Sequence, residues 1–150
     1  MFEKAKRIAE IAHKGQVRLG GEPFINHPMR LTAHFDSETR KTVAVLHDLV
    51  EDTNWTLEDL RNEGFSDEVV DAVDSLTRRE HESYLNFILR AAKNEIGKEV
   101  KLIDVEDNLA DCEKQIADPK MHSVHRQKFK YLRTRYQLAR YILTHLVDKE

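Results

Sequence analysis

The sequence predicts an all-α protein folded as a single helical bundle. Apolar residues recur at the spacing of one helix face along most of the 150 residues. Alternation of apolar and polar residues, the pattern of a strand, is absent, and glycine and proline number only five and three. A composition of 40% hydrophobic and 34% charged residues is ordinary for a water-soluble domain. We expect one domain, residues 1–150, with a real hydrophobic core.

The charge balance and the cysteine count limit the kinds of partner and the compartment that we expect. A net charge of -3 and a pI near 6.2 argue against duplex nucleic acid as the main partner, although a local basic pocket is allowed. No apolar run approaches the roughly 18 residues of a membrane span, and the N-terminus does not resemble a secretory signal. Cys112 is the only cysteine, so no intrachain disulfide can form. We expect a cytoplasmic protein without nucleic acid polymer or membrane as partner; a homo-oligomer is compatible with the sequence.

The N-terminal part is expected to form two helices joined by a long loop. The first helix is predicted for residues 2–14, and glycine follows it. Residues 15–28 hold three of the five glycines and two of the three prolines, which predicts a loop. This loop carries Arg18 and ends near His27, and a loop this long in a small domain is more often functional than idle. A second helix is expected from residue 28 to about residue 35, because proline suits the first helical turn.

A third helix is predicted from a cap at Ser37 to about Thr53. Besides an apolar stripe it carries a polar stripe of side chains three or four residues apart: His47, Asp48, Glu51 and Asp52. Three carboxylates within one turn repel each other by roughly a few tenths of a kcal/mol per close pair, and by more beside a buried stripe. A divalent metal ion would remove this repulsion. The alternative for this helix alone is a solvated acidic face with an incidental histidine.

Capping residues and glycines delimit the remaining helices. They are expected at residues 56–63, from Ser66 to about Leu76, at 83–93, at 99–116, and from residue 122 or 123 for roughly 25 residues. Gly97 is predicted to break the 83–93 helix. Asp104 lies within the apolar face of that helix, and a buried carboxylate needs a partner. Either Lys101 or a metal ion could be that partner.

Four side chains from three segments are candidates for one metal site: His27, His47, Asp48 and Asp104. Two imidazoles and two carboxylates suit Mn²⁺, Fe²⁺ or Zn²⁺ better than Ca²⁺ or an ion that prefers thiolates. Four protein ligands on an octahedral ion leave two positions open for water and substrate, as a catalytic site requires. Such an ion activates water and binds a phosphoryl oxygen, so hydrolysis of a phosphate ester is the expected reaction.

Further polar residues could complete this site. Glu51 and Asp52 lie one turn beyond the predicted ligands, where one could orient or deprotonate the attacking water and the other could protonate the leaving oxygen. An anionic substrate also needs positive contacts. Arg18 is the best placed, whereas Arg78 and Arg79 are weaker candidates that we favour as solvated charges.

Four local sequence words resemble the hydrolase half of the RelA/SpoT family of HD-domain metal-dependent phosphohydrolases. They are residues 12–18 (AHKGQVR), 21–28 (GEPFINHP), 46–53 (LHDLVEDT) and 100–104 (VKLID), the last followed by Asn108. A lone histidine-aspartate pair would be weak evidence, but the ordered set at compatible spacings is specific. The resemblance covers about residues 5–110.

This resemblance implies an all-α HD-domain fold and a bound Mn²⁺ ion. It implies removal of the 3′-pyrophosphate from guanosine tetra- or pentaphosphate, which gives GDP or GTP. By position, it implies four metal ligands (His27, His47, Asp48 and Asp104), a catalytic acidic pair (Glu51 and Asp52) and two substrate contacts (Arg18 and Asn108). The family's synthetase and regulatory domains have no room in this chain, which is similar to the stand-alone small alarmone hydrolases.

The chain departs from the family on the substrate side. Leu19 stands where the family often has a second basic residue, and residues 105–107 (VED) are more acidic than usual. Both differences should weaken the binding of a highly charged substrate. A second hypothesis is therefore that the substrate is another nucleotide, such as a dinucleotide 2′- or 3′-phosphate or a nucleoside monophosphate. A third is a catalytically silent module that binds a nucleotide or a protein. The intact acidic pair argues against it.

Two tyrosines on the expected last helix are also of interest. Tyr131 or Tyr136 could line the base pocket, as a tyrosine on the family's last helix does, or either could be core.

Overall fold

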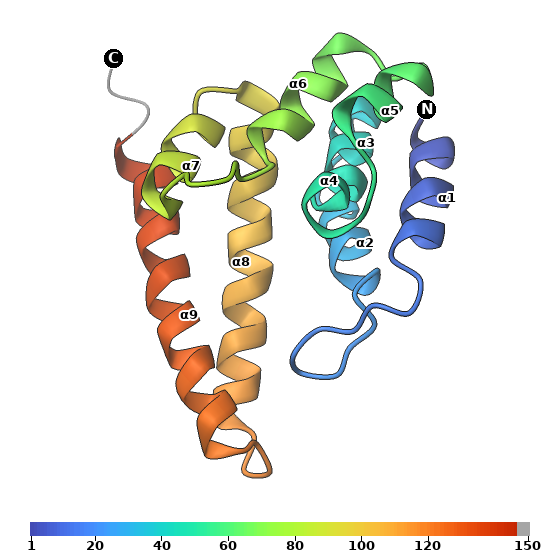
Figure 1. The fold of residues 1–150 in the computed structure, drawn as a ribbon. Helices are drawn as coiled ribbons and strands as arrows, with labels where there is room; N and C mark the ends of the chain where they lie inside the picture. The colour runs from blue at the N-terminus through green and yellow to red at the C-terminus, as the bar shows by residue number, and fades with distance from the viewer. Residues whose placement is uncertain (147–150) are drawn as a thin grey trace.

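The computed structural model describes residues 1–146, which form helices and no β-strand (Figure 1). The helices are α1 (Phe2–Ala12), α2 (Asn26–Thr32), α3 (Glu38–Leu46), α4 (Leu49–Asp52), α5 (Leu57–Asn62), α6 (Asp67–Ser75), α7 (Tyr84–Ala91), α8 (Glu95–Ala117), α9 (Ser123–Tyr141) and the π-helical turn η1 (Ile142–Leu146). The prediction of an all-α fold is confirmed. Across these residues no helix combines the length and the apolar character needed to cross a bilayer.

Helix α8 is the element that connects the two sides of the molecule. It lies beside α9 along most of its length, and on its other side it contacts α2, α3 and α6 (Figure 1). Its side chains accordingly join two apolar clusters. Val100 belongs to the cluster formed with α1, α3 and α6, and Val105 to the cluster formed with α7 and the C-terminal helix. Burial of each such side chain contributes roughly 1.5–3 kcal/mol, so both clusters fix α8, and with it Asp104, which lies between these two valines.

The predicted third helix is interrupted, so the prediction of one continuous helix to about Thr53 is wrong. Helix α3 begins as expected, with the Ser37 side chain accepting a hydrogen bond from the Arg40 amide, but Asp48 leaves the helical conformation at φ -102° and ψ 2°. Helix α4 then starts anew at Leu49. Successive side chains on a regular helix point about 100° apart. At the break, His47 and Asp48 face the same point, with His47 Nε2 2.9 Å from Asp48 Oδ2.

The prediction that Gly97 breaks the 83–93 helix is also wrong. Helix α7 already ends at Ala91, and α8 begins before the glycine, where the Asn94 side chain caps it by accepting a hydrogen bond from the Gly97 amide at 2.8 Å. A Cβ atom at position 97 would overlap the Ser75 hydroxyl of α6. This glycine therefore permits close packing of α6 on α8. The other predicted helices begin within a few residues of their expected starts, and all but the last also end as expected. The expected end of the last helix, near residue 147, lies outside the described residues.

Candidate metal centre

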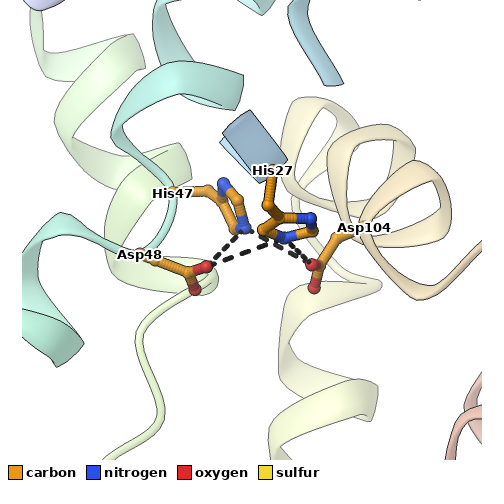
Figure 2. Close-up of side chains that lie close together, drawn as sticks. All are labelled: His27, His47, Asp48 and Asp104. Atoms are coloured by element: carbon orange, nitrogen blue, oxygen red, sulfur yellow. Dashed lines mark hydrogen bonds and ion pairs between the residues drawn. The ribbon is translucent and has the colours of Figure 1, made fainter. Parts of the chain in front are cut away.

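The structure brings the four predicted ligands together (Figure 2). His27 comes from α2, His47 and Asp48 from the break between α3 and α4, and Asp104 from the middle of α8. One possible ligand atom from each lies within 4.8 Å of all the others. The shortest separations are 2.8 Å between His27 Nε2 and Asp104 Oδ1 and 2.9 Å between His47 Nε2 and Asp48 Oδ2. This group could hold a metal ion, since it offers the nitrogen and oxygen donors that borderline divalent ions bind.

His47 is oriented as a metal ligand. Its ring is 1% exposed, and its Nδ1 donates a hydrogen bond to the Ala44 carbonyl oxygen at 2.7 Å. A neutral imidazole with its proton on Nδ1 presents a lone pair at Nε2. That nitrogen is buried and has no hydrogen-bond partner among residues 1–146, and it faces the other three ligands (Figure 2). An orphaned buried acceptor between carboxylates is what a bound cation would satisfy.

Both carboxylate oxygens of Asp104 have partners. Oδ2 accepts a hydrogen bond from Lys101 Nζ at 2.7 Å. Oδ1 accepts one from Asn108 Nδ2 at 3.0 Å and faces His27 and His47. The two partners considered for this carboxylate, a lysine and a metal ion, are thus compatible with each other. Burial disfavours its charge, but above all the neighbouring ammonium of Lys101 outweighs burial and holds the pKa of Asp104 well below its usual range. The carboxylate is therefore ionised and ready to bind a cation at neutral pH.

Glu51 and Asp52 lie on α4 and line the same pocket as Asp48. Partial desolvation and the nearby charges of Asp48 and Glu51 raise the pKa of Asp52 to about 7. Desolvation also raises the pKa of Glu51, together with Asp48, although a hydrogen bond from the Arg78 amide opposes the rise. A carboxyl group with a pKa near neutrality can both give and take a proton at working pH. The acidic pair is therefore suited to proton transfer.

The segment whose backbone contacts Glu51 is held in place by Arg90. This segment is the connection between α6 and α7, and the amide of its residue Arg78 contacts Glu51. Arg90 of α7 closes this connection, because its guanidinium donates to the Thr77 carbonyl oxygen at 2.7 Å and to the Glu82 carboxylate at 2.8 Å. The Glu82–Arg90 pair thus supports the position of one member of the acidic pair.

We expect Glu82→Gln to lower the free energy of unfolding by on the order of 1–3 kcal/mol near neutral pH. The Arg90 hydrogen bonds, outweighing burial, lower the pKa of the Glu82 carboxyl to about 2. A carboxyl whose pKa falls on folding stabilises the protein above its unfolded pKa and loses that contribution as pH falls toward the folded pKa. Urea unfolding should therefore show a gap between variant and wild type that narrows below about pH 4.5. A gap independent of pH would contradict this account; Glu113→Gln, at an exposed ion pair, is the matched control.

A pocket of about 680 Å³ opens beside the ligands. Both predicted substrate contacts line it, and they touch each other, since Arg18 Nη2 donates to Asn108 Oδ1 at 2.7 Å. Tyr136 lies in the pocket wall, whereas Tyr131 is 65% exposed and is neither core nor pocket lining. Of the two tyrosines, only Tyr136 is thus placed to contact a bound molecule.

Sequence reasoning missed several residues around this site. Arg135 and Tyr84 line the pocket on the side of α7 and α9, and the Arg135 guanidinium lies 3.7 Å from the centre of the Tyr84 ring. Asp107 contacts His27 directly at 2.7 Å. Its place three residues after Asp104, on the same helix face, was the signal that could have revealed it. Arg78 lines the pocket too, while Arg79 is an exposed charge, as favoured for it.

Comparison with known proteins places the chain among longer relatives. No family model matches it. It is 42% identical over 81 residues to a GTP pyrophosphokinase of Streptomyces coelicolor (51% of this chain, 9% of the relative) and 40% identical over 79 residues to a guanosine-3′,5′-bis(diphosphate) 3′-pyrophosphohydrolase of Borreliella burgdorferi (50% and 12%). The pyrophosphohydrolase of the same description from Aquifex aeolicus is 32% identical over 121 residues (72% and 17%). The chain therefore spans less than a fifth of each of these relatives.

A solved structure of a metazoan ortholog of SpoT has the same fold. Its TM-score is 0.74, with 24% sequence identity over 99% of this chain and 87% of that one. The similarity in sequence and the similarity in fold thus point to the same group of proteins. The chain is a helical domain with the fold of this SpoT ortholog, and in sequence it is similar to the pyrophosphokinases and pyrophosphohydrolases named above.

Proposed function

We propose that this chain is a metal-dependent phosphohydrolase that removes the 3′-pyrophosphate of guanosine 3′,5′-bis(diphosphate), or of the corresponding pentaphosphate, and leaves GDP or GTP. The observation that supports it best is the group of four ligands at the edge of a pocket that also contains two acidic side chains and an arginine. Several relatives are named for this reaction, which favours the guanosine substrate over other nucleotides. That the chain is one domain, cytoplasmic and able to form a homo-oligomer stays a prediction.

His27, His47, Asp48 and Asp104 would hold the ion, for which we propose Mn²⁺, with Fe²⁺ or Zn²⁺ as alternatives. When bound, such an ion polarises a phosphoryl oxygen and lowers the pKa of a coordinated water.

The acidic pair would move the protons. Glu51, held by the Arg78 amide, would take a proton from the water that attacks the phosphorus next to the 3′-oxygen. Asp52, with its pKa of about 7, would give a proton to the departing 3′-oxygen of the ribose. The bond between this oxygen and phosphorus breaks, so the products are pyrophosphate and a nucleotide with a free 3′-hydroxyl. Arg18 and Asn108 would bind the nucleotide beside this point.

A panel of nucleotides incubated with Mn²⁺ tests the proposal. We expect the guanosine tetraphosphate to yield pyrophosphate and GDP in equal amounts, and Asp48→Ala protein to yield neither. Release of orthophosphate from a nucleoside monophosphate or from a dinucleotide 2′- or 3′-phosphate, with the guanosine tetraphosphate untouched, would overturn the substrate and support the second candidate. A lack of turnover across the panel by metal-loaded protein would leave the silent binding module as the better account.

The second candidate, a less highly charged nucleotide, is favoured by the surroundings of Arg18. The guanidinium lies within 3.4–3.5 Å of carboxylate oxygens of Glu22, Asp107 and Asp111. These carboxylates partly neutralise it, and Leu19 adds no charge at the pocket wall. A tetraphosphate must therefore compete for this arginine with carboxylates of the protein.

A further inference from the structure

We propose that Asp107 is a positioning residue that holds His27 in the tautomer that can bind a metal ion, and that Arg30 holds Asp107 in place. The inference rests on the metal centre of the proposed function and adds to it two residues that are not ligands. It concerns the ring orientation and tautomer of one ligand, and it is independent of which nucleotide is the substrate.

His27 is held between two carboxylates. Its ring is 2% exposed; Nε2 lies 2.8 Å from Asp104 Oδ1, and Nδ1 lies 2.7 Å from Asp107 Oδ2. The metal-facing nitrogen is Nε2, because it lies 3.8 Å from Asp48 Oδ2 as well as close to Asp104 (Figure 2). Binding an ion there requires a lone pair on Nε2 and hence the ring proton on Nδ1. An ionised Asp107 can only accept a hydrogen bond, so it favours the proton on Nδ1. Asp104 is ionised as well, but with an ion bound its Oδ1 would face the ion and not a proton on Nε2, so Asp107 decides the tautomer of the loaded site.

The two histidines of the site are oriented by different acceptors. His47 donates its Nδ1 proton to a neutral backbone carbonyl, that of Ala44. His27 donates to the charged carboxylate of Asp107, which makes the stronger hydrogen bond and a more basic imidazole. Removing the side chain at position 107 therefore affects one ligand of the site and leaves the other unchanged.

Arg30 fixes Asp107 from the opposite side. Its Nε donates to Oδ1 at 2.9 Å and its Nη2 to Oδ2 at 3.0 Å, a two-point contact with the planar carboxylate. Arg30 and His27 lie three residues apart on α2, so both reach the same carboxylate of α8 from one helix face. Arg30 also pairs with Glu22 in the glycine-rich loop. The charge of Asp107 is thus matched and its orientation is set before any ion binds.

A third neighbour of Asp107 makes it possible to distinguish a specific effect on the metal site from a general loss of structure. Its Oδ2 lies 3.4 Å from Nη1 of Arg18, the proposed substrate contact. Loss of the carboxylate should weaken the metal site, yet it should free positive charge on Arg18. We therefore expect substitution of Asp107 to lower metal affinity without raising the KM for an anionic nucleotide at saturating Mn²⁺. A general loss of structure would worsen both.

Equilibrium titration with Mn²⁺, read by the electron paramagnetic resonance of the free ion, tests the inference. We expect Asp107→Leu to bind Mn²⁺ about 10–100-fold more weakly than wild type, the usual cost of losing a residue that orients a ligand. Asp107→Asn keeps an acceptor oxygen and should lose less, and Arg30→Gln should fall between wild type and Asp107→Leu. Glu113→Gln, which removes an exposed carboxylate from the same helix, should bind as wild type does.

The tautomer itself can be observed with Zn²⁺ as a diamagnetic probe. In ¹⁵N-histidine-labelled wild type loaded with Zn²⁺, the His27 signals should show the proton on Nδ1, and Asp107→Leu should lose this single form. Wild-type Mn²⁺ affinity in folded Asp107→Leu protein would overturn the inference while leaving the proposed function intact. Weak metal binding by this variant, together with a metal-loaded wild type that turns over no nucleotide, would sustain the inference and refute the function. A wild type that binds neither Mn²⁺ nor Zn²⁺ would refute both.

Discussion

Asp48→Ala protein is expected to lose its metal ion and its turnover while keeping its helices. Asp48 offers an oxygen 2.9 Å from His47 Nε2 and 3.8 Å from His27 Nε2, so the centre loses a ligand with this side chain. The residue lies in the break between α3 and α4 and not in either apolar cluster, so its removal leaves no cavity in the core. We expect turnover to fall by about three orders of magnitude or more, alongside metal content near zero and unchanged far-ultraviolet circular dichroism.

The control for this variant is Asp71→Ala, which removes an exposed carboxylate from α6. It should retain metal and activity. Full activity of metal-free Asp48→Ala protein would remove the metal centre from the reaction, and a loss of helix content would mean that the substitution had tested folding instead.

The acidic pair is expected to separate metal binding from catalysis. Glu51→Gln and Asp52→Asn should each bind Mn²⁺ with nearly the wild-type affinity, because neither residue belongs to the group of four ligands. Each should lose about 10²–10⁴-fold in kcat, the usual contribution of a positioned proton donor or acceptor. The pH profile adds a second measurement. Asp52 must carry a proton to act as the donor, and its pKa is raised to about 7, so wild-type kcat should fall as pH rises through about 7. Asp52→Asn should abolish this fall.

Glu58→Gln offers a matched control, because it removes an exposed carboxyl group from α5 and alters neither member. Its kcat should stay near that of wild type. Turnover of either acidic-pair variant at the wild-type rate would exclude that residue from the proton transfers.

The helices could be predicted from the sequence because apolar spacing and capping residues act locally. Ser37 and Ser66 cap their helices as expected. The break at Asp48 could not be predicted in this way. Residues 42–53 have helical periodicity throughout, and the non-helical backbone at Asp48 coincides with the ligand group, which a local pattern does not reveal. Gly97 was misjudged for a related reason. Whether a glycine ends a helix or permits another helix to approach depends on what lies opposite, here Ser75.

The gathering of the site illustrates the same limit. Resemblance of the local words to a family identified His27, His47, Asp48 and Asp104 as one group, and the structure brings them together. Residue type and spacing alone could not distinguish Tyr131 from Tyr136. Which of them faces the pocket depends on how α9 packs on α8. The partners of Asp107 lie 77 and 80 residues away in the sequence, beyond the reach of any local pattern.

The shared carboxylate of Asp104 has a consequence for the choice of ion. Lys101 holds Oδ2, whereas Oδ1 faces the other ligands, so Asp104 would act as a monodentate ligand. Ca²⁺ favours six to eight oxygen donors and often takes carboxylates through both oxygens. A lysine behind the carboxylate therefore lowers the number of oxygen donors that the protein can supply. This disfavours Ca²⁺ relative to the smaller borderline ions and leaves coordination positions for the atoms that react.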